Sequence, residues 1–244
     1  MATLPKKDGG TRTVAIATTI YRLTMEMDYD EMMEFERDNK YSRDSAAAGS
    51  SATTAAEQRA LEAEVAKAEG KHVLMILWDL RKFFDSIDIE ALFDEARRLD
   101  FPFRQLVLSM IVHQAPRRLK LGSAIVDAIT QMGRSMLAGC KRSTQFARCY
   151  TLRLVKGLAY RHAGSVLTRS VSLYQHVDDL SALVVANSKA AVVAAALAFT
   201  RDFKHGTDAL KLDISEKKHG SAEEPGISEV CKTCKPVQGP HEGR

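Results

Sequence analysis

Two adjacent aspartates, Asp178 and Asp179, stand between two apolar, strand-prone stretches within residues 172–185. Short apolar stretches on both sides of a polar pair predict a β-hairpin with carboxylates at its tip. Adjacent carboxylates repel each other, and nothing in a hairpin requires them. A bound divalent cation would offset this repulsion. The pair therefore indicates a metal-dependent site, which requires a partner elsewhere in the chain.

The partner candidate is Asp79, which interrupts the otherwise apolar run His72–Leu80. Such a run predicts a strand buried on both faces, and an acid in that position is costly unless it is paired or metal-bound. If this strand neighbours the hairpin in one sheet, Asp79 and Asp178 converge. Carboxylates from two strands can hold two Mg²⁺ ions that clamp the oxygens of a phosphoryl transfer. The alternative is that Asp79 caps a helix and the adjacent acids form an ordinary turn.

The other elements are predicted from the spacing of apolar residues and from the turn-forming residues between them. We expect helices over 25–43, 57–71, 89–99, 103–113, 143–160 and 188–203, with short strands near 11–17, 117–121 and 210–214. From residue 72 onward, the order strand, helices, hairpin, helix, strand predicts an α+β fold. It has a ferredoxin-like split βαβ layout, with an antiparallel sheet and helices on one face. The Ser/Ala/Gly/Thr-rich stretch 44–58 predicts a flexible linker, and the polar stretch 221–244 predicts a disordered tail.

The formal net charge is only +4, but the basic residues are unevenly distributed. They gather near the start and in the middle of the chain, which favours a polyanionic partner over the alternative of a solvated basic face. The members are Lys6, Lys7, Arg12, Arg22, Arg117, Arg118, Lys120, Arg134, Lys141, Arg142, Arg148 and Arg153.

The N-terminus has no apolar segment of the secretory type, and no apolar run reaches the ~18 residues that span a membrane. We therefore expect an intracellular protein of the nucleus or cytoplasm, with no membrane partner. The four cysteines form no disulfide framework. Cys231 and Cys234 make one CxxC, which falls short of the four ligands that zinc requires, so a disordered tail is the better expectation there.

Five motifs, in order, resemble the fingers and palm of reverse transcriptases (RNA-directed DNA polymerases), in the style of group II intron and non-LTR retroelement enzymes. They are residues 4–12 with 21–23, 78–88, 136–143, 176–179 and 210–218. The resemblance reaches to about Gly220. It implies a partial fingers subdomain over 1–43, a linker and solvated helix over 44–71, and a palm over 72–220 with the catalytic carboxylates, followed by the tail 221–244.

The resemblance also implies roles for individual residues. Two Mg²⁺ ions, or Mn²⁺, would be bound by carboxylates, and a lysine would protonate the leaving pyrophosphate. An aromatic ring five positions after Asp79 would clash with a 2′-hydroxyl and so select deoxynucleotides; its neighbour Phe83 is the better candidate for the core. The implied metal ligands are Asp79, Asp178 and Asp179; the general acid is Lys218; the substrate-binding residues are Lys6, Arg12, Arg22, Phe84 and Gly139.

The implied activity is that of an RNA-directed DNA polymerase, a nucleotidyltransferase that adds deoxynucleotides to a primer paired with an RNA or DNA template. The sequence departs from the family pattern at His176, Ala138 and Thr13, and shows no primer-grip hairpin or thumb. A truncated or degenerate retroelement fragment, inactive or only binding nucleic acid, is therefore the main alternative. Phe84 argues against an RNA-dependent RNA polymerase. Template preference and oligomeric state stay open.

Overall fold

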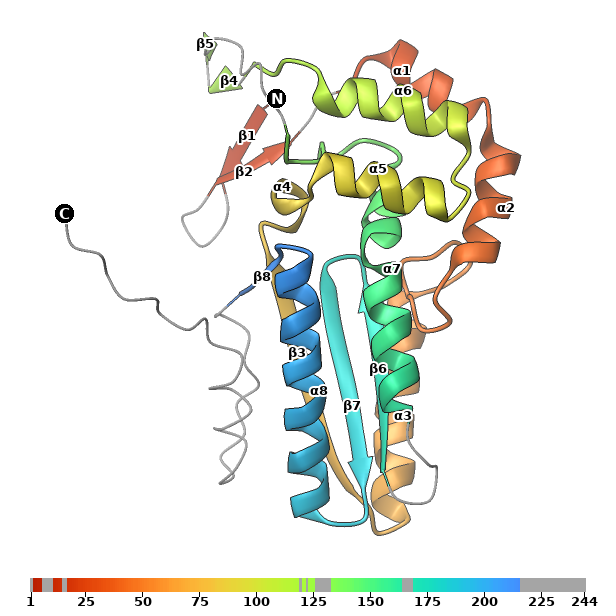
Figure 1. The fold of residues 1–244 in the computed structure, drawn as a ribbon, viewed down its shortest axis with the longest axis vertical. Helices are drawn as coiled ribbons and strands as arrows, with labels where there is room; N and C mark the ends of the chain where they lie inside the picture. Colours follow the sequence, from red (N-terminus) through yellow and green to blue (C-terminus); the bar gives the residue numbers. More distant parts are fainter. Residues whose placement is uncertain are drawn as a thin grey trace, which may run out of the picture. The chain divides into compact units, whose positions relative to one another are not determined.

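A computed structural model describes residues 2–5, 11–14, 17–118, 120–121, 123–125, 133–163 and 169–215 (Figure 1). The chain forms two compact units, each made of two segments that are distant in the sequence. The first unit comprises residues 1–40 and 82–153, and the second comprises 41–81 and 154–244. Among the described residues, no helix has the length and apolar character needed to cross a membrane.

The second unit is built on an antiparallel sheet with the strand order β6-β7-β3-β8. Its strands are β3 (His72–Arg81), β6 (Arg169–His176), β7 (Asp179–Ala186) and β8 (Asp213–Ile214). Strands β6 and β7 form the predicted hairpin, and β7 pairs directly with β3 along eight residues. The sheet therefore confirms the predicted α+β fold class and places the acid-bearing strand beside the hairpin.

Helix α8 (Lys189–Ala209) packs on one face of this sheet. The Trp78 ring lies 5.7 Å from that of Phe199 and 4.6 Å from that of Phe203, centroid to centroid. All three side chains are buried, and they form the centre of this layer. Burying large aromatic side chains is the main stabilising contribution here, at about 1.5–3 kcal/mol for each side chain.

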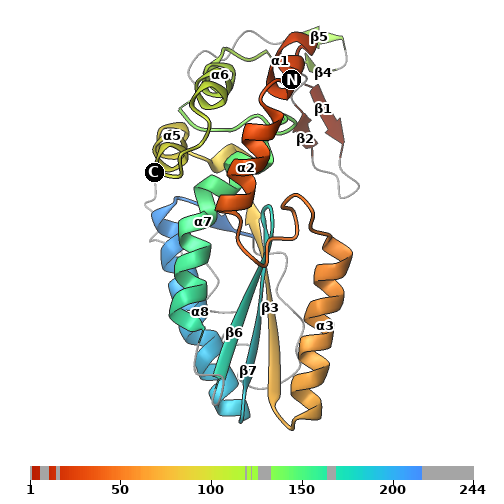
Figure 2. The same ribbon diagram turned by 90° about the vertical axis from the view of Figure 1, so that its right-hand side faces the viewer.

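Helix α3 (Ala52–Ala68) lies on the opposite face (Figure 2). Its Arg59 donates from Nη1 to Ser181 Oγ at 2.6 Å. Side chains alternate between faces along a strand, so Ser181 points away from its neighbour Leu180, which is paired with Trp78. The expected arrangement had helices on one face only. Helix α8 fulfils it, and α3 adds a second layer that sequence periodicity did not reveal.

The stretch 44–58, expected as a flexible linker, is hydrogen-bonded to the sheet. Gln175 N donates to Arg43 O at 3.1 Å, and Ser45 N donates to Gln175 O at 2.9 Å. Asp44 is buried, and α3 already begins at Ala52. A stretch of small residues is flexible when its backbone N–H and C=O groups have no hydrogen-bond partners. Here the edge strand β6 provides such partners for the start of the stretch.

The first unit is mostly helical, with a small sheet of order β2-β1-β4-β5. Its elements are β1 (Ala2–Pro5), β2 (Thr11–Val14), α1 (Thr19–Glu26), α2 (Tyr29–Asn39), α4 (Phe83–Ser86), α5 (Ile89–Arg98), α6 (Phe103–Gln114), β4 (Lys120–Leu121) and β5 (Ala124–Ile125). Helix α7 (Ser143–His162) belongs to this unit up to Arg153. In its core the Phe101 ring is stacked on that of Phe146 at 4.9 Å and lies tilted against that of Phe35 at 4.7 Å, centroid to centroid. The single helix expected over 25–43 is replaced by α1 and α2.

Candidate active site

Asp79 on β3 and Asp179 on β7 are directly opposed in the antiparallel register. Directly opposed residues project from the same face of a sheet, with Cβ atoms about 4.5–5.5 Å apart. Both carboxylates therefore lie on the face opposite to Trp78, near the end of two central strands. The strand pairing brings together the two acids that the sequence places 100 positions apart.

The backbone at the hairpin tip is strained. His176 pairs with Asp179, so Val177 and Asp178 form a two-residue turn. Val177 has φ 56°, in the left-handed region that a β-branched residue rarely adopts. Gln175 Nε2 donates to Val177 O at 3.1 Å and helps to hold the turn. Such strain costs roughly 1–3 kcal/mol and is typical of functional sites.

The outer edge of the hairpin is clamped by the segment that precedes α3. Tyr41 donates its hydroxyl to Leu173 O at 2.8 Å, and Ser45 Oγ lies 3.0 Å from His176 Nδ1. A cleft of about 320 Å³ lies beside this clamp. Among the residues that line it are Asp179, His176, Ser45 and Arg59. The cleft thus combines the carboxylate of Asp179 with the guanidinium of Arg59.

Glu62 on α3 forms a second set of polar contacts on the sheet face that α3 covers. Glu62 accepts hydrogen bonds from Arg43 Nη1 at 2.8 Å and from the Tyr174 hydroxyl at 2.5 Å. Arg43 also lies over the Tyr174 ring, 4.8 Å from its centroid. Burial, together with the hydrogen bond to Glu62, raises the pKa of Tyr174 above its ordinary value. This network of Arg43, Glu62 and Tyr174 holds α3 against β6. No motif in the sequence predicted it.

The carboxylates of the site are too few to enclose a metal ion by themselves, but they meet the smaller requirement of Mg²⁺. No group of three or more His, Cys, Asp or Glu side chains arranged to hold a metal occurs among the residues that the structure describes. Mg²⁺, however, is commonly bound through one or two carboxylates together with water and substrate phosphates. The opposed pair Asp79 and Asp179 provides that number of carboxylates, with Asp178 next to it in the turn.

Phe84 belongs to the first unit, on the single-turn helix α4. Phe83 is buried, as expected for a core residue, whereas Phe84 is half-buried. The two rings meet edge-on with centroids 5.5 Å apart. Met136 N donates to Phe84 O at 2.7 Å, so the glycine-containing motif is attached to the backbone of Phe84.

Gly139 occupies a tight turn in which Cys140 N donates to Leu137 O at 3.1 Å. Its φ of 99° requires glycine or a strained residue. The next basic residue, Lys141, forms an ion pair with Glu26, and burial, Arg142 and Arg22 together lower its pKa. The exposed Arg22 on α1 is therefore close enough to Lys141, two positions after Gly139, to act on its charge.

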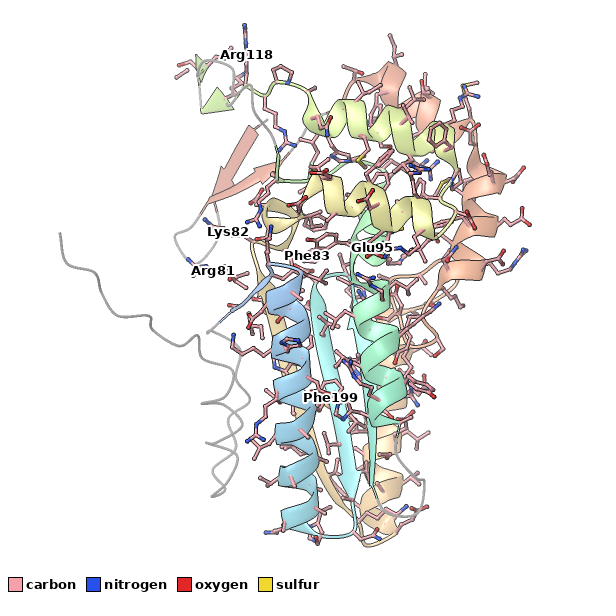
Figure 3. All side chains as sticks on the ribbon, in the orientation of Figure 1. Arg81, Lys82, Phe83, Glu95, Arg118 and Phe199 are labelled. Atoms are coloured by element: carbon pink, nitrogen blue, oxygen red, sulfur yellow. The ribbon has the colours of Figure 1, made fainter. Side chains whose placement is uncertain are left out.

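Three predicted residues fall wholly or partly outside the described part of the chain. Lys6 and Lys218 lie outside it, and only the backbone of Arg12, on β2, is described. Their roles stay predictions. At the end of β3, Arg81 and Lys82 are exposed (Figure 3).

Solved structures share this fold. The chain is similar to an apo telomerase from Candida tropicalis truncated from its C-terminal domain, at 12% identity and a TM-score of 0.50, covering 85% of this chain and 41% of that one. A telomerase from the same organism in complex with a TWJ fragment of telomeric RNA matches at 11% identity and a TM-score of 0.50, covering 81% and 32%. The chain thus spans less than half of their length.

No individual curated protein matches the chain. The family model of the reverse transcriptase (RNA-dependent DNA polymerase) matches residues 4–226, which is most of the sequence. That interval includes the opposed acids, the strained hairpin tip, Phe84 and the Gly139 turn. By this match, the chain belongs to the reverse transcriptase (RNA-dependent DNA polymerase) family.

Proposed function

We propose that this chain carries the palm and part of the fingers of an RNA-directed DNA polymerase, which extends a primer with deoxynucleotides. The observation that carries the proposal is the register of β3 against β7, which opposes Asp79 to Asp179 beside a strained turn that holds Asp178. Like charges directly opposed in a sheet destabilise it. A cation bound in the working enzyme would offset this repulsion.

Each residue has a defined task in this proposal. Asp79, Asp178 and Asp179 hold two Mg²⁺ ions, which when bound lower the barrier to attack by the primer 3′-hydroxyl and stabilise the leaving pyrophosphate. The cleft lined by Asp179 and His176 receives the primer terminus. Phe84 excludes the 2′-hydroxyl of a ribonucleotide, and Lys218 protonates the pyrophosphate.

The remaining substrate contacts are assigned to the first unit. Arg12, Arg22 and Lys6 bind the triphosphate or the template, because guanidinium and ammonium groups suit phosphate oxygens. Gly139 allows the backbone to approach the nucleotide, since it has no Cβ. The similarity to a telomerase in complex with an RNA fragment supports a nucleic acid partner for this chain.

The test is primer extension by the full chain with Mg²⁺, on RNA and DNA templates, with either dNTPs or NTPs. We expect dNTP incorporation by the wild type and its loss in Asp79→Asn and Asp179→Asn. Asp94→Asn, at an exposed position of α5, is the matched control and should keep full activity. Full extension by the Asp79→Asn variant would contradict the proposal. Binding of primer–template without any incorporation would favour an inactive, nucleic-acid-binding fragment.

A further inference from the structure

The backbone around Phe84 is held by a segment far away in the sequence. Met136 N donates to Phe84 O at 2.7 Å, and Ser135 N donates to Ile87 O at 3.0 Å. These two bonds join α4 and the residue that follows it to residues 135–136. The position of the Phe84 ring therefore depends on where Ser135 and Met136 are held.

Ser135 itself is in an unfavourable conformation. Its φ of 88° lies in the region that residues other than glycine rarely adopt. Its Oγ donates to Asp85 Oδ1 at 3.1 Å, in addition to the bond from its backbone N–H to Ile87. A strained residue persists only where surrounding interactions over-determine it, and such residues concentrate at functional sites.

Arg117 supplies the decisive part of these interactions. Its Nη1 donates to Ser135 Oγ at 2.9 Å, and its Nη2 donates to Ser135 O at 2.5 Å and to His113 O at 2.6 Å. Arg117 is only 5% exposed. The planar fork of a guanidinium can bind both oxygens of one residue together, which an ammonium group cannot reproduce. His113 Nδ1 in turn accepts from Leu137 N at 3.0 Å.

We propose that Arg117 is a positioning residue for sugar discrimination: through Ser135 it fixes the backbone of Phe84, and thereby the ring that excludes the 2′-hydroxyl. The path runs from the Arg117 guanidinium to the strained Ser135, from Ser135 to Asp85 and Ile87, and from Met136 to Phe84 O. This inference rests on the proposed function, because it assigns Arg117 to the selectivity that Phe84 is proposed to provide.

The test compares kcat/KM for dNTP and NTP incorporation in the wild type, Phe84→Val, Arg117→Lys and Ser135→Ala. We expect Phe84→Val to remove most of the preference for dNTPs. Arg117→Lys and Ser135→Ala should each lower the preference about tenfold, mainly by admitting NTPs, with kcat for dNTPs nearly unchanged. Arg104→Lys, at an exposed position of α6, is the matched control and should leave the preference unchanged.

Amide hydrogen exchange gives a readout that needs no catalysis. In Arg117→Lys, the amides of Ser135, Met136 and Leu137 should exchange faster than in the wild type, while those of β3 and β7 stay unchanged. Unchanged exchange at these amides would overturn the inference whether or not the chain polymerises. If Phe84→Val loses the preference and both Arg117→Lys and Ser135→Ala keep it, the inference alone fails. If Phe84→Val keeps the preference for dNTPs, the proposed role of Phe84 is wrong, and the inference about Arg117, which rests on that role, is wrong as well.

Discussion

At the scale of single residues, unfavourable features gather where the family motifs lie. Within the described part of the chain, five residues other than glycine have a positive φ, and three of them adjoin proposed site residues: Lys82, Ser135 and Val177. The opposed acids Asp79 and Asp179 add electrostatic repulsion at the end of the central strands. Strain and repulsion of this kind lower stability, so their concentration at one set of motifs indicates selection for a task other than folding.

The opposed acids predict a trade-off between stability and activity. Asp79→Asn removes one of two directly opposed charges, so without metal the free energy of unfolding should rise by about 0.2–1 kcal/mol, measured by urea denaturation. Adding Mg²⁺ should stabilise the wild type, because a ligand that binds the folded state favours it, and should stabilise the variant less. Asp94→Asn serves as control. A metal-free variant clearly less stable than the wild type would contradict the repulsion argument.

His113 predicts a pH dependence of stability. Burial, with a smaller effect of Arg117, lowers the pKa of His113 to about 4 from an ordinary value of 6.5. The folded state therefore favours neutral histidine, in keeping with Nδ1 accepting from Leu137 N. Above pH 6.5 this histidine is neutral in the folded and the unfolded state, so it does not change the free energy of unfolding. As pH falls from 6.5 towards 4 only the unfolded state gains the proton, and stability drops by up to about 3 kcal/mol.

The measurement for this prediction is urea denaturation at several values between pH 4 and pH 7, for the wild type and His113→Gln. The variant cannot titrate at this position, so its stability should fall less steeply over this interval even if it starts lower. Parallel curves for the two proteins would show that His113 is not responsible for acid sensitivity.

At the scale of elements, the sequence predicts well what periodicity encodes. The apolar run His72–Leu80 becomes β3, and the apolar stretches around Asp178 become the β6–β7 hairpin. Helix α8 was expected to end at Phe203 but continues to Ala209, where Thr207 is still buried. The sequence predicted that Asp79 and Asp178 converge, because one acid interrupts an apolar run and the acid pair separates two others. The register instead opposes Asp79 to Asp179, and Asp178 lies in the turn. Arg117, Ser135 and Arg59 had no such marker, since their partners are fixed only by tertiary packing.

Helices α7 and α8 contain a matched pair of glycines. A Cβ at Gly157 would have open space, whereas a Cβ at Gly206 would lie 2.1 Å from Leu154 Cδ1. Gly157→Ala should therefore raise the free energy of unfolding by about 0.5–1 kcal/mol, through helix propensity. Gly206→Ala should lower it by about 1–3 kcal/mol, because Leu154 must give way. Thermal or urea denaturation checks both; equal effects would show that the α7–α8 contact is loosely packed.

At the scale of the whole molecule, neither unit is a continuous piece of chain. Each combines an early and a late segment, and the chain passes between units near residues 40, 81 and 153. The motifs are divided accordingly: the carboxylates belong to the second unit, and Phe84, Arg22 and the Gly139 turn belong to the first. We therefore expect that activity requires both units in one chain, and that no single cut yields a functional fragment.

The charge of the whole chain leads to the last prediction, on nucleic acid binding. Of the predicted central basic group, Arg117, Arg142 and Arg148 are buried. With a net charge of +4 and exposed basic residues such as Arg22, Arg118 and Arg134, binding should still be dominated by phosphate contacts and weaken steeply with salt. Contact with about three phosphates of duplex would weaken affinity roughly 40-fold between 50 and 200 mM salt. Fluorescence anisotropy with a primer–template duplex measures this, and Asp79→Asn should bind as tightly as the wild type without magnesium. Affinity that does not change with salt would contradict a phosphate-dominated interface and would leave the basic clusters as a solvated surface.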